Sequence, residues 1–172
     1  MMSATFMLAV ALAAAPQQPA GSATIGSFRA GYDLVKGHLL KAVDQVPEEH
    51  FAFKPTPDVR SIGDLFGHIA DSNFGICGIA SGDKPAMSGI EKAKKSKAEL
   101  REALAASFKA CDAAFDGLTD ARANETVKFF LPGSHTRLSV LVFNAHHDWE
   151  HYGNIVTYMR LKGLVPPSSQ GR

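Results

Sequence analysis

Four amphipathic stretches with clear starts and stops most constrain how this chain can fold. Apolar residues recur at helical spacing over about 24–46, 61–80, 97–118 and 137–162, and strand signals are scarce after residue 22. Pro47 stops the first stretch, and Gly163 with the Pro166-Pro167 pair stops the last. Ser61-Ile62-Gly63-Asp64 and Ser96-Lys97-Ala98-Glu99 match capping boxes at the starts of the second and third. The sequence therefore predicts an all-α fold, a bundle of four long helices.

Two connections, residues 82–95 and 119–136, lack this periodicity. The first is rich in Gly, Pro and Lys, and we expect its lysines to form a solvated surface. The second contains an apolar run, Val127 to Leu131, which favours a short extended piece. The second helix has glycines at 63, 67, 75 and 78. Because each interior Gly costs about 0.5–1 kcal/mol relative to Ala, they indicate either a close approach by another segment or a helix that depends on its neighbours.

The amino-terminal segment differs from the rest, because residues 1–20 carry no charged side chain. The small and apolar run from Ala4 to Ala15 suits the core of a secretory signal and is shorter than the roughly 20 residues of a membrane span. Cleavage is expected after Ala11-Leu12-Ala13 or Ala13-Ala14-Ala15. We therefore expect a cleaved signal peptide at 1–20, one helical domain at 22–169, periplasmic or secreted location and no stable membrane insertion. The alternative is a disordered Ala/Pro-rich tail on a cytoplasmic protein.

Charge and cysteine content narrow the function. Eighteen Lys and Arg against seventeen Asp and Glu give a formal charge of +1, which lacks the basic excess that binding to nucleic acid requires. Two cysteines are too few for a disulfide scaffold or a four-thiolate zinc site, although one disulfide between Cys77 and Cys111 is permitted in an exported protein. Cys111 lies on the apolar stripe of its helix, which favours a buried apolar role over a nucleophile. Any metal must therefore be held by His or carboxylate side chains, and the chain has seven histidines.

A polar ridge on the last helix concentrates candidate ligands. At 100° per residue its five members fall within an arc of about 80°; they are Asn144, His147, His151, Asn154 and Tyr158. His147 and His151 are four residues apart, so both imidazoles can reach one ion. This pair alone is a weak signal. His68, on an otherwise buried side of the second helix, is the candidate third ligand, although a lone His there is more often a satisfied core residue.

These residues resemble a known family. The chain resembles the DinB/YfiT-like metalloprotein superfamily over about residues 24–169. The resemblance lies in the stretch from Arg60 to Asp71, the segment from His147 to Asn154, and the closing Gly163 with Pro166-Pro167. The resemblance implies a four-helix bundle with one divalent metal, Zn, Ni or Fe, held by His68, His147 and His151. It also implies a homodimer. Many members carry His-Arg-Gly-Gln where this chain has His151-Tyr152-Gly153-Asn154, and Asn reaches less far than Gln.

The ligand set predicts a class of chemistry. Three neutral imidazoles leave a fourth position open, as in catalytic zinc sites, where a water or a thiol is activated. We expect a metal-dependent enzyme acting on a small molecule, either a hydrolase or a thiol S-transferase, both of which the resemblance implies. The alternative is a non-catalytic metal-binding or stress-associated protein. Candidate neighbours of the ligands are Asn144, Asn154, Tyr158 and Asp71, and a solvated carboxylate is an equally good interpretation of Asp71. His135 could approach from a loop, but an exposed residue without a role is the simpler interpretation.

Overall fold

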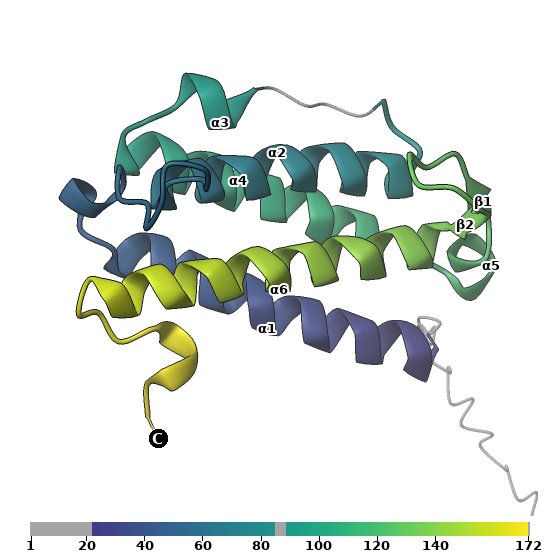
Figure 1. Ribbon diagram of the computed structural model, residues 1–172. Coiled ribbons are helices and arrows are strands. Elements are labelled where there is room, and N and C mark those ends of the chain that lie inside the picture. Colours follow the sequence, from purple (N-terminus) through teal and green to yellow (C-terminus); the bar gives the residue numbers. More distant parts are fainter. Residues whose placement is uncertain (1–21, 85–88, 172) are drawn as a thin grey trace, which may run out of the picture.

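Four long helices form the body of the described part of the chain, and Figure 1 shows how they lie side by side. The computed structural model describes residues 22–84 and 89–171, so the predicted signal peptide lies outside the described residues. The long helices are α1 (Ala23–Gln45), α2 (Ile62–Ser81), α4 (Lys97–Asp116) and α6 (Arg137–Leu161). Both α1 and α2 pack against α4 and α6. The predicted all-α bundle is confirmed.

Capping boxes start three of the long helices, and the Ser22 hydroxyl, which accepts from the Ile25 amide, caps the fourth, α1. In α2 and α4 the predicted capping boxes form, with the Ser61 hydroxyl accepting from the Asp64 amide and the Ser96 hydroxyl from the Glu99 amide. A third box, between Thr136 and Ser139, starts α6 and was not predicted. These caps satisfy backbone N–H groups that have no partner within the helix, which fixes where each helix begins.

Short elements occupy the two connections, which the sequence predicted as irregular chain with a short extended piece from Val127 to Leu131 in the second. The first holds α3 (Ile90–Ala93), which lies over α2. The second holds α5 (Asp120–Ala123), and β1 (Thr126–Val127) pairs antiparallel with β2 (His135–Thr136). Two 3₁₀ turns complete the fold, η1 (Glu48–His50) and η2 (Pro167–Ser169). A helix of one turn or a strand of two residues is too short to show a period, which is why the pattern missed them.

Two of the α2 glycines lie under chain that crosses close to the helix. A Cβ added to Gly67 would lie 2.7 Å from the Cα of Glu91, and one added to Gly63 would lie 3.1 Å from the carbonyl oxygen of Phe51. Real Cβ atoms essentially never approach as closely as 2.7 Å. Gly67 therefore allows α3 to rest directly on α2, whereas the other long helices are not involved in this contact.

The core lies between the four long helices and includes a covalent link. Its largest fully buried side chains are Tyr32, Leu39, Ile62, Phe66, Ile69, Leu100, Leu104, Phe108, Leu141, Ile155 and Met159. Cys77 and Cys111 form a disulfide between α2 and α4, with their Cα atoms 5.1 Å apart and both side chains buried. Cys111 is thus buried in the core, as predicted, and is paired. None of the described helices combines the length and apolarity needed to cross a membrane.

Candidate metal centre

Three histidine nitrogens converge between α2 and α6. The Nε2 atom of His147 lies 3.1 Å from Nε2 of His68 and 3.0 Å from Nε2 of His151. One ligand atom from each of the three side chains lies within 4.8 Å of the others. His68 comes from the first half of α2, and His147 and His151 occupy successive turns of α6, which packs against α2. The structure therefore brings together the three predicted ligands.

The environment of the three rings keeps them neutral. Burial, and after it the charges of His151, His68 and Arg60, together lower the pKa of His147 to about 3. Burial, then the charge of His68, lowers the pKa of His151 to about 4. The pKa of His68 is also lowered by burial and by Arg60, although the Glu91 carboxylate opposes this change. Neutral imidazole is the form that ligates a metal, so the site needs no deprotonation near neutral pH.

The geometry of the nitrogens fits a bound divalent ion. At a Zn–N distance of about 2.0–2.1 Å, two nitrogens of a tetrahedral site lie roughly 3.3 Å apart. The Nε2–Nε2 distances of 3.1 Å from His147 to His68 and 3.0 Å from His147 to His151 are close to this value. Without a cation, lone pairs of neutral rings would face one another across these short distances unless a ring N–H lies between them. Three imidazoles without a thiolate suit Zn, Ni or Fe in preference to Mg or Ca.

A carboxylate orients His68 for this role. The other ring nitrogen of His68, Nδ1, lies 3.2 Å from Oε2 of Glu91 in α3. When Nδ1–H donates to the carboxylate, Nε2 is left with its lone pair facing the other two histidines. Glu91 also accepts from Nε of Arg60 at 2.9 Å. Glu91 was not among the predicted site residues, although it is the only acidic residue in the sequence between positions 84 and 98.

Asp71 acts on the site through α3. Its carboxylate accepts from the backbone amides of Ile90 and Glu91 at 2.9 and 3.0 Å, and its side chain is buried. It is therefore a cap for the first turn of α3, neither a solvated carboxylate nor a direct neighbour of the ligand nitrogens. Together with Gly67, it fixes the backbone of Glu91 beside His68.

The remaining predicted neighbours lie in two different places. Asn154 is exposed, and its amide lies 3.5 Å from Nδ1 of His151, at the limit of a hydrogen bond. Since Nδ1 carries the proton when Nε2 is a ligand, the amide oxygen would have to face the ring, and the two amide orientations are nearly indistinguishable by shape. Tyr158, one turn further on, lines the same pocket as Asn154.

Asn144 lies in a buried polar cluster. Its Nδ2 donates to Oδ1 of Asn73 at 2.8 Å and to Oδ2 of Asp148 at 3.4 Å. Burial raises the pKa of Asp148 well above its usual value. The hydrogen bonds of Asn144 thus lead into the bundle and away from the histidines. His135, in β2, bonds through Nε2 to the carbonyl of Pro132 and is not in the three-histidine group.

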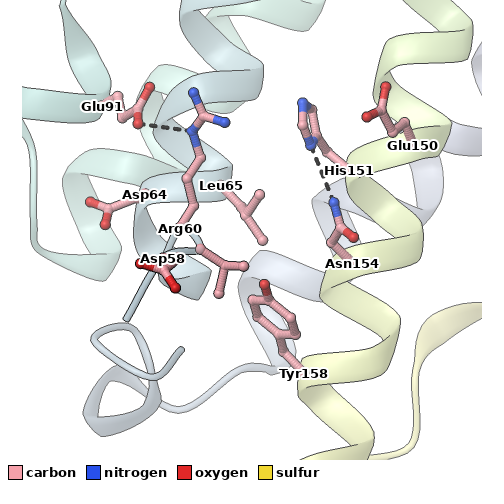
Figure 2. Close-up of a pocket in the computed structure, with 10 residues that line it drawn as sticks. Asp58, Arg60, Asp64, Leu65, Glu91, Glu150, His151, Asn154 and Tyr158 are labelled. Carbon is pink, nitrogen blue, oxygen red and sulfur yellow. Dashed lines mark hydrogen bonds and ion pairs between the residues drawn. The ribbon is translucent and has the colours of Figure 1, made fainter. Parts of the chain in front are cut away.

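A polar pocket of about 590 Å³ opens on the His151 side (Figure 2). Figure 2 shows Arg60 between Glu91 and the α6 wall, which carries Glu150, His151, Asn154 and Tyr158. Two carboxylates that line this pocket are already in ion pairs, Asp64 with Lys95 and Glu91 with Arg60. This pocket gives solvent and polar solutes access to the site.

An apolar pocket of about 430 Å³ adjoins the other two histidines. His68 and His147 line it together with Ser72, Gly75, Ile76 and Ile79 of α2, Phe143 of α6 and Phe130 of the loop between β1 and β2. The three histidines therefore separate a polar space from an apolar one. Pockets on both sides distinguish this centre from a closed structural metal site.

The family follows from a match over most of the chain. Residues 32–155 match the model of the DinB superfamily, and this range includes all three histidines. The chain therefore belongs to the DinB superfamily. No curated protein matches it.

Solved structures share the fold. A DinB-like protein from Bacillus cereus ATCC 10987 superposes with a TM-score of 0.71 and 19% identity, over 83% of this chain and 95% of that one. A DinB-like protein from Bacillus subtilis superposes with a TM-score of 0.67 and 16% sequence identity, over 85% of this chain and 99% of that one. The mycothiol-dependent maleylpyruvate isomerase superposes with a TM-score of 0.62 and 14% sequence identity, over 78% of this chain and 65% of the isomerase. At these identities the likeness concerns the fold alone.

Proposed function

We propose that this protein is a metal-dependent enzyme in which His68, His147 and His151 hold one divalent ion that activates water or a thiol. The observation that carries the proposal is the convergence of three Nε2 atoms from two helices, with 3.1 and 3.0 Å spacings. A divalent ion held by three neutral imidazoles keeps an open position, at which the pKa of a water or a thiol falls toward neutrality.

The residues around the ligands do the positioning. Glu91 holds the tautomer and direction of the His68 ring, and Asn154 does the same more weakly for His151 when its amide oxygen faces Nδ1. Arg60 offers a positive charge at the polar pocket, where it can bind a negatively charged part of a substrate. Glu150 lines this pocket beside His151 and supplies a carboxylate that can take up a proton.

Two observations favour an enzyme over the non-catalytic alternative. The site is bordered by two pockets, whereas a metal centre that only stabilises a fold needs none. The fold is also shared with a mycothiol-dependent isomerase. That analogy supports the thiol branch only at the level of the fold.

We also propose that the protein is exported. The disulfide between Cys77 and Cys111 supports this proposal, because such bridges persist in oxidising compartments and are rare in the cytosol. Mass spectrometry of the protein from periplasmic and culture fractions is expected to find a chain beginning after Ala13 or Ala15. Intact protein confined to the cytosol would contradict export, and it would favour the thiol branch because the usual low-molecular-weight thiols are cytosolic.

The test of the proposed function compares metal content and activity in the same set of proteins. The purified chain is expected to bind about one Zn²⁺, Ni²⁺ or Fe²⁺, and the triple variant His68→Ala/His147→Ala/His151→Ala is expected to bind none. His146→Ala is the matched control, because His146 is exposed on the same helix. Equal metal content in the wild type and the triple variant would contradict the site. Ester, amide and thiol-transfer substrates then separate the branches, and a metal-loaded but uniformly inactive protein would favour the non-catalytic alternative.

A further inference from the structure

The apolar pocket beside His68 and His147 has the composition of a binding site for a hydrocarbon group. Among the described residues that line it, the only polar side chain besides the two histidines is Ser72, which is 8% exposed. The other walls are Ile76 and Ile79 on α2 and two phenylalanines. An ion or a charged group placed there would lose its hydration without a compensating partner. The pocket therefore suits an uncharged apolar group.

An aromatic wall leads from the surface to the ligands. Phe130 is 65% exposed, which is a large aromatic area to leave in water. Its ring centroid lies 5.8 Å from that of Phe143, and Phe129 contacts both rings at 4.2 and 5.3 Å. The ring of Phe143 lies nearly parallel to that of His147, with centroids 6.5 Å apart. A ligand that covered Phe130 would thus have continuous apolar contact up to the metal ligands.

We propose that this pocket binds an uncharged alkyl or aryl group of the substrate, next to the atom that reacts at the three histidines. This inference rests on the proposed function, which puts the reacting atom at the convergence of the Nε2 atoms. The polar remainder of the substrate lies on the His151 side, where Arg60 and Tyr158 line the other pocket. The substrate class is thus an amphipathic small molecule whose reactive group adjoins its apolar end.

A series of n-alkyl hydroxamates tests the pocket directly, because the hydroxamate head binds a metal and only the tail changes. With the zinc-loaded protein, calorimetry is expected to show the dissociation constant falling about fourfold for each methylene added until the tail fills the pocket. An ω-ammonium tail of the same length is expected to give no such gain. A dissociation constant that does not change with tail length would overturn the proposal.

Two variants locate the effect. Phe130→Ala removes the exposed aromatic wall, so the dissociation constant is expected to fall only about twofold for each methylene added. Ser72→Leu fills part of the pocket from α2, so the dissociation constant should stop falling at a tail about two methylenes shorter than in the wild type. Leu131→Ala is the matched control on the same loop, because Leu131 is 37% exposed and does not line the pocket. If the control and Phe130→Ala behave alike, or if Phe130→Ala changes only the oligomeric state, the pocket assignment is wrong.

The two proposals can fail separately. Binding of acetohydroxamate, which has almost no tail, reports the metal site, whereas the dependence on tail length reports the pocket. If the protein holds no metal, 1-hexanol replaces the hydroxamates, and the methyl resonances of Ile76 and Ile79 are observed by NMR. Saturable shifts that Ser72→Leu weakens would support the pocket alone, and their absence would overturn it.

Discussion

Replacing Glu91 with Gln tests whether a carboxylate in α3 holds His68 as a metal ligand. The change keeps the size of the side chain but removes its charge, so the hydrogen bond to Nδ1 of His68 weakens. Loss of such a partner costs about 10–100-fold in metal affinity. The distance of 3.2 Å between Nδ1 of His68 and Oε2 of Glu91 is long for a charge-assisted hydrogen bond. Glu91 also accepts a hydrogen bond from Nε of Arg60. We therefore expect the lower limit, about tenfold, which corresponds to about 1.4 kcal/mol.

Competition for Zn²⁺ against a chromophoric chelator measures this change. Glu150→Gln is the control, because it removes a carboxylate from the same pocket without removing a partner of a histidine. We expect it to change the affinity by less than twofold. Unfolding in urea without metal should show Glu91→Gln within about 1 kcal/mol of wild type, since its ion pair with Arg60 is partly exposed.

If Glu91→Gln binds Zn²⁺ as tightly as the wild type, the carboxylate does not hold His68 as a metal ligand. The same conclusion follows if Glu150→Gln loses the same tenfold in affinity, because the effect would then come from the general negative charge of the pocket and not from the orientation of His68.

Three further outcomes are expected. Asp71→Ala leaves two α3 amides without their acceptor, so urea unfolding should show a loss of about 1–3 kcal/mol, and Zn²⁺ affinity should fall as well. Cys77→Ser/Cys111→Ser opens a loop with a sequence separation of 34, which should lower the free energy of unfolding by about 4 kcal/mol; a loss below 1 kcal/mol would contradict the chain-entropy argument. The free energy of unfolding of the metal-free protein should fall as the pH falls from about 6.5 toward 4. In the folded protein the pKa values of His147 and His151 are lowered to about 3 and 4, so both rings stay neutral over most of this range. In the unfolded chain the same rings bind protons, which favours unfolding. A His147→Gln variant, unfolded in urea across this range, should show a shallower decline.

Local signals made the long helices predictable. The capping boxes at Ser61 and Ser96 and the stops at Pro47 and Gly163 depend on neighbours within a few residues, so the sequence alone defines them. The convergence of the three histidines could also be predicted, because helical phase placed His147 and His151 together and the family resemblance added His68.

Long-range packing could not be predicted in the same way. Glu91 reaches His68 across 23 residues of sequence, and it does so only because Gly67 lets α3 rest on α2. The glycines indicated a close approach, but no local pattern identifies which segment approaches.

The polar ridge of α6 shows another limit of helical phase. Phase gives direction around the helix but not position along it, and Asn144 and Tyr158 are about 20 Å apart along the axis. One ion cannot adjoin both. The two ends of the ridge accordingly differ, since Asn144 joins Asn73 in the interior and Tyr158 lines a solvent-accessible pocket.

The disulfide lies within the stretch of chain that the histidines close. His68 and His147 are 79 residues apart, and the bridge bypasses 34 of these, so the effective path between them in an oxidised unfolded chain is about 45 residues. Loop-closure entropy grows only with the logarithm of length, so this shortcut favours reassembly of the three-histidine site by about 0.5 kcal/mol. The disulfide and the three-histidine cluster thus share one stretch of chain, but forming one changes the free energy of forming the other very little. A reduced chain that still folds would assemble the three-histidine cluster almost as readily as an oxidised one.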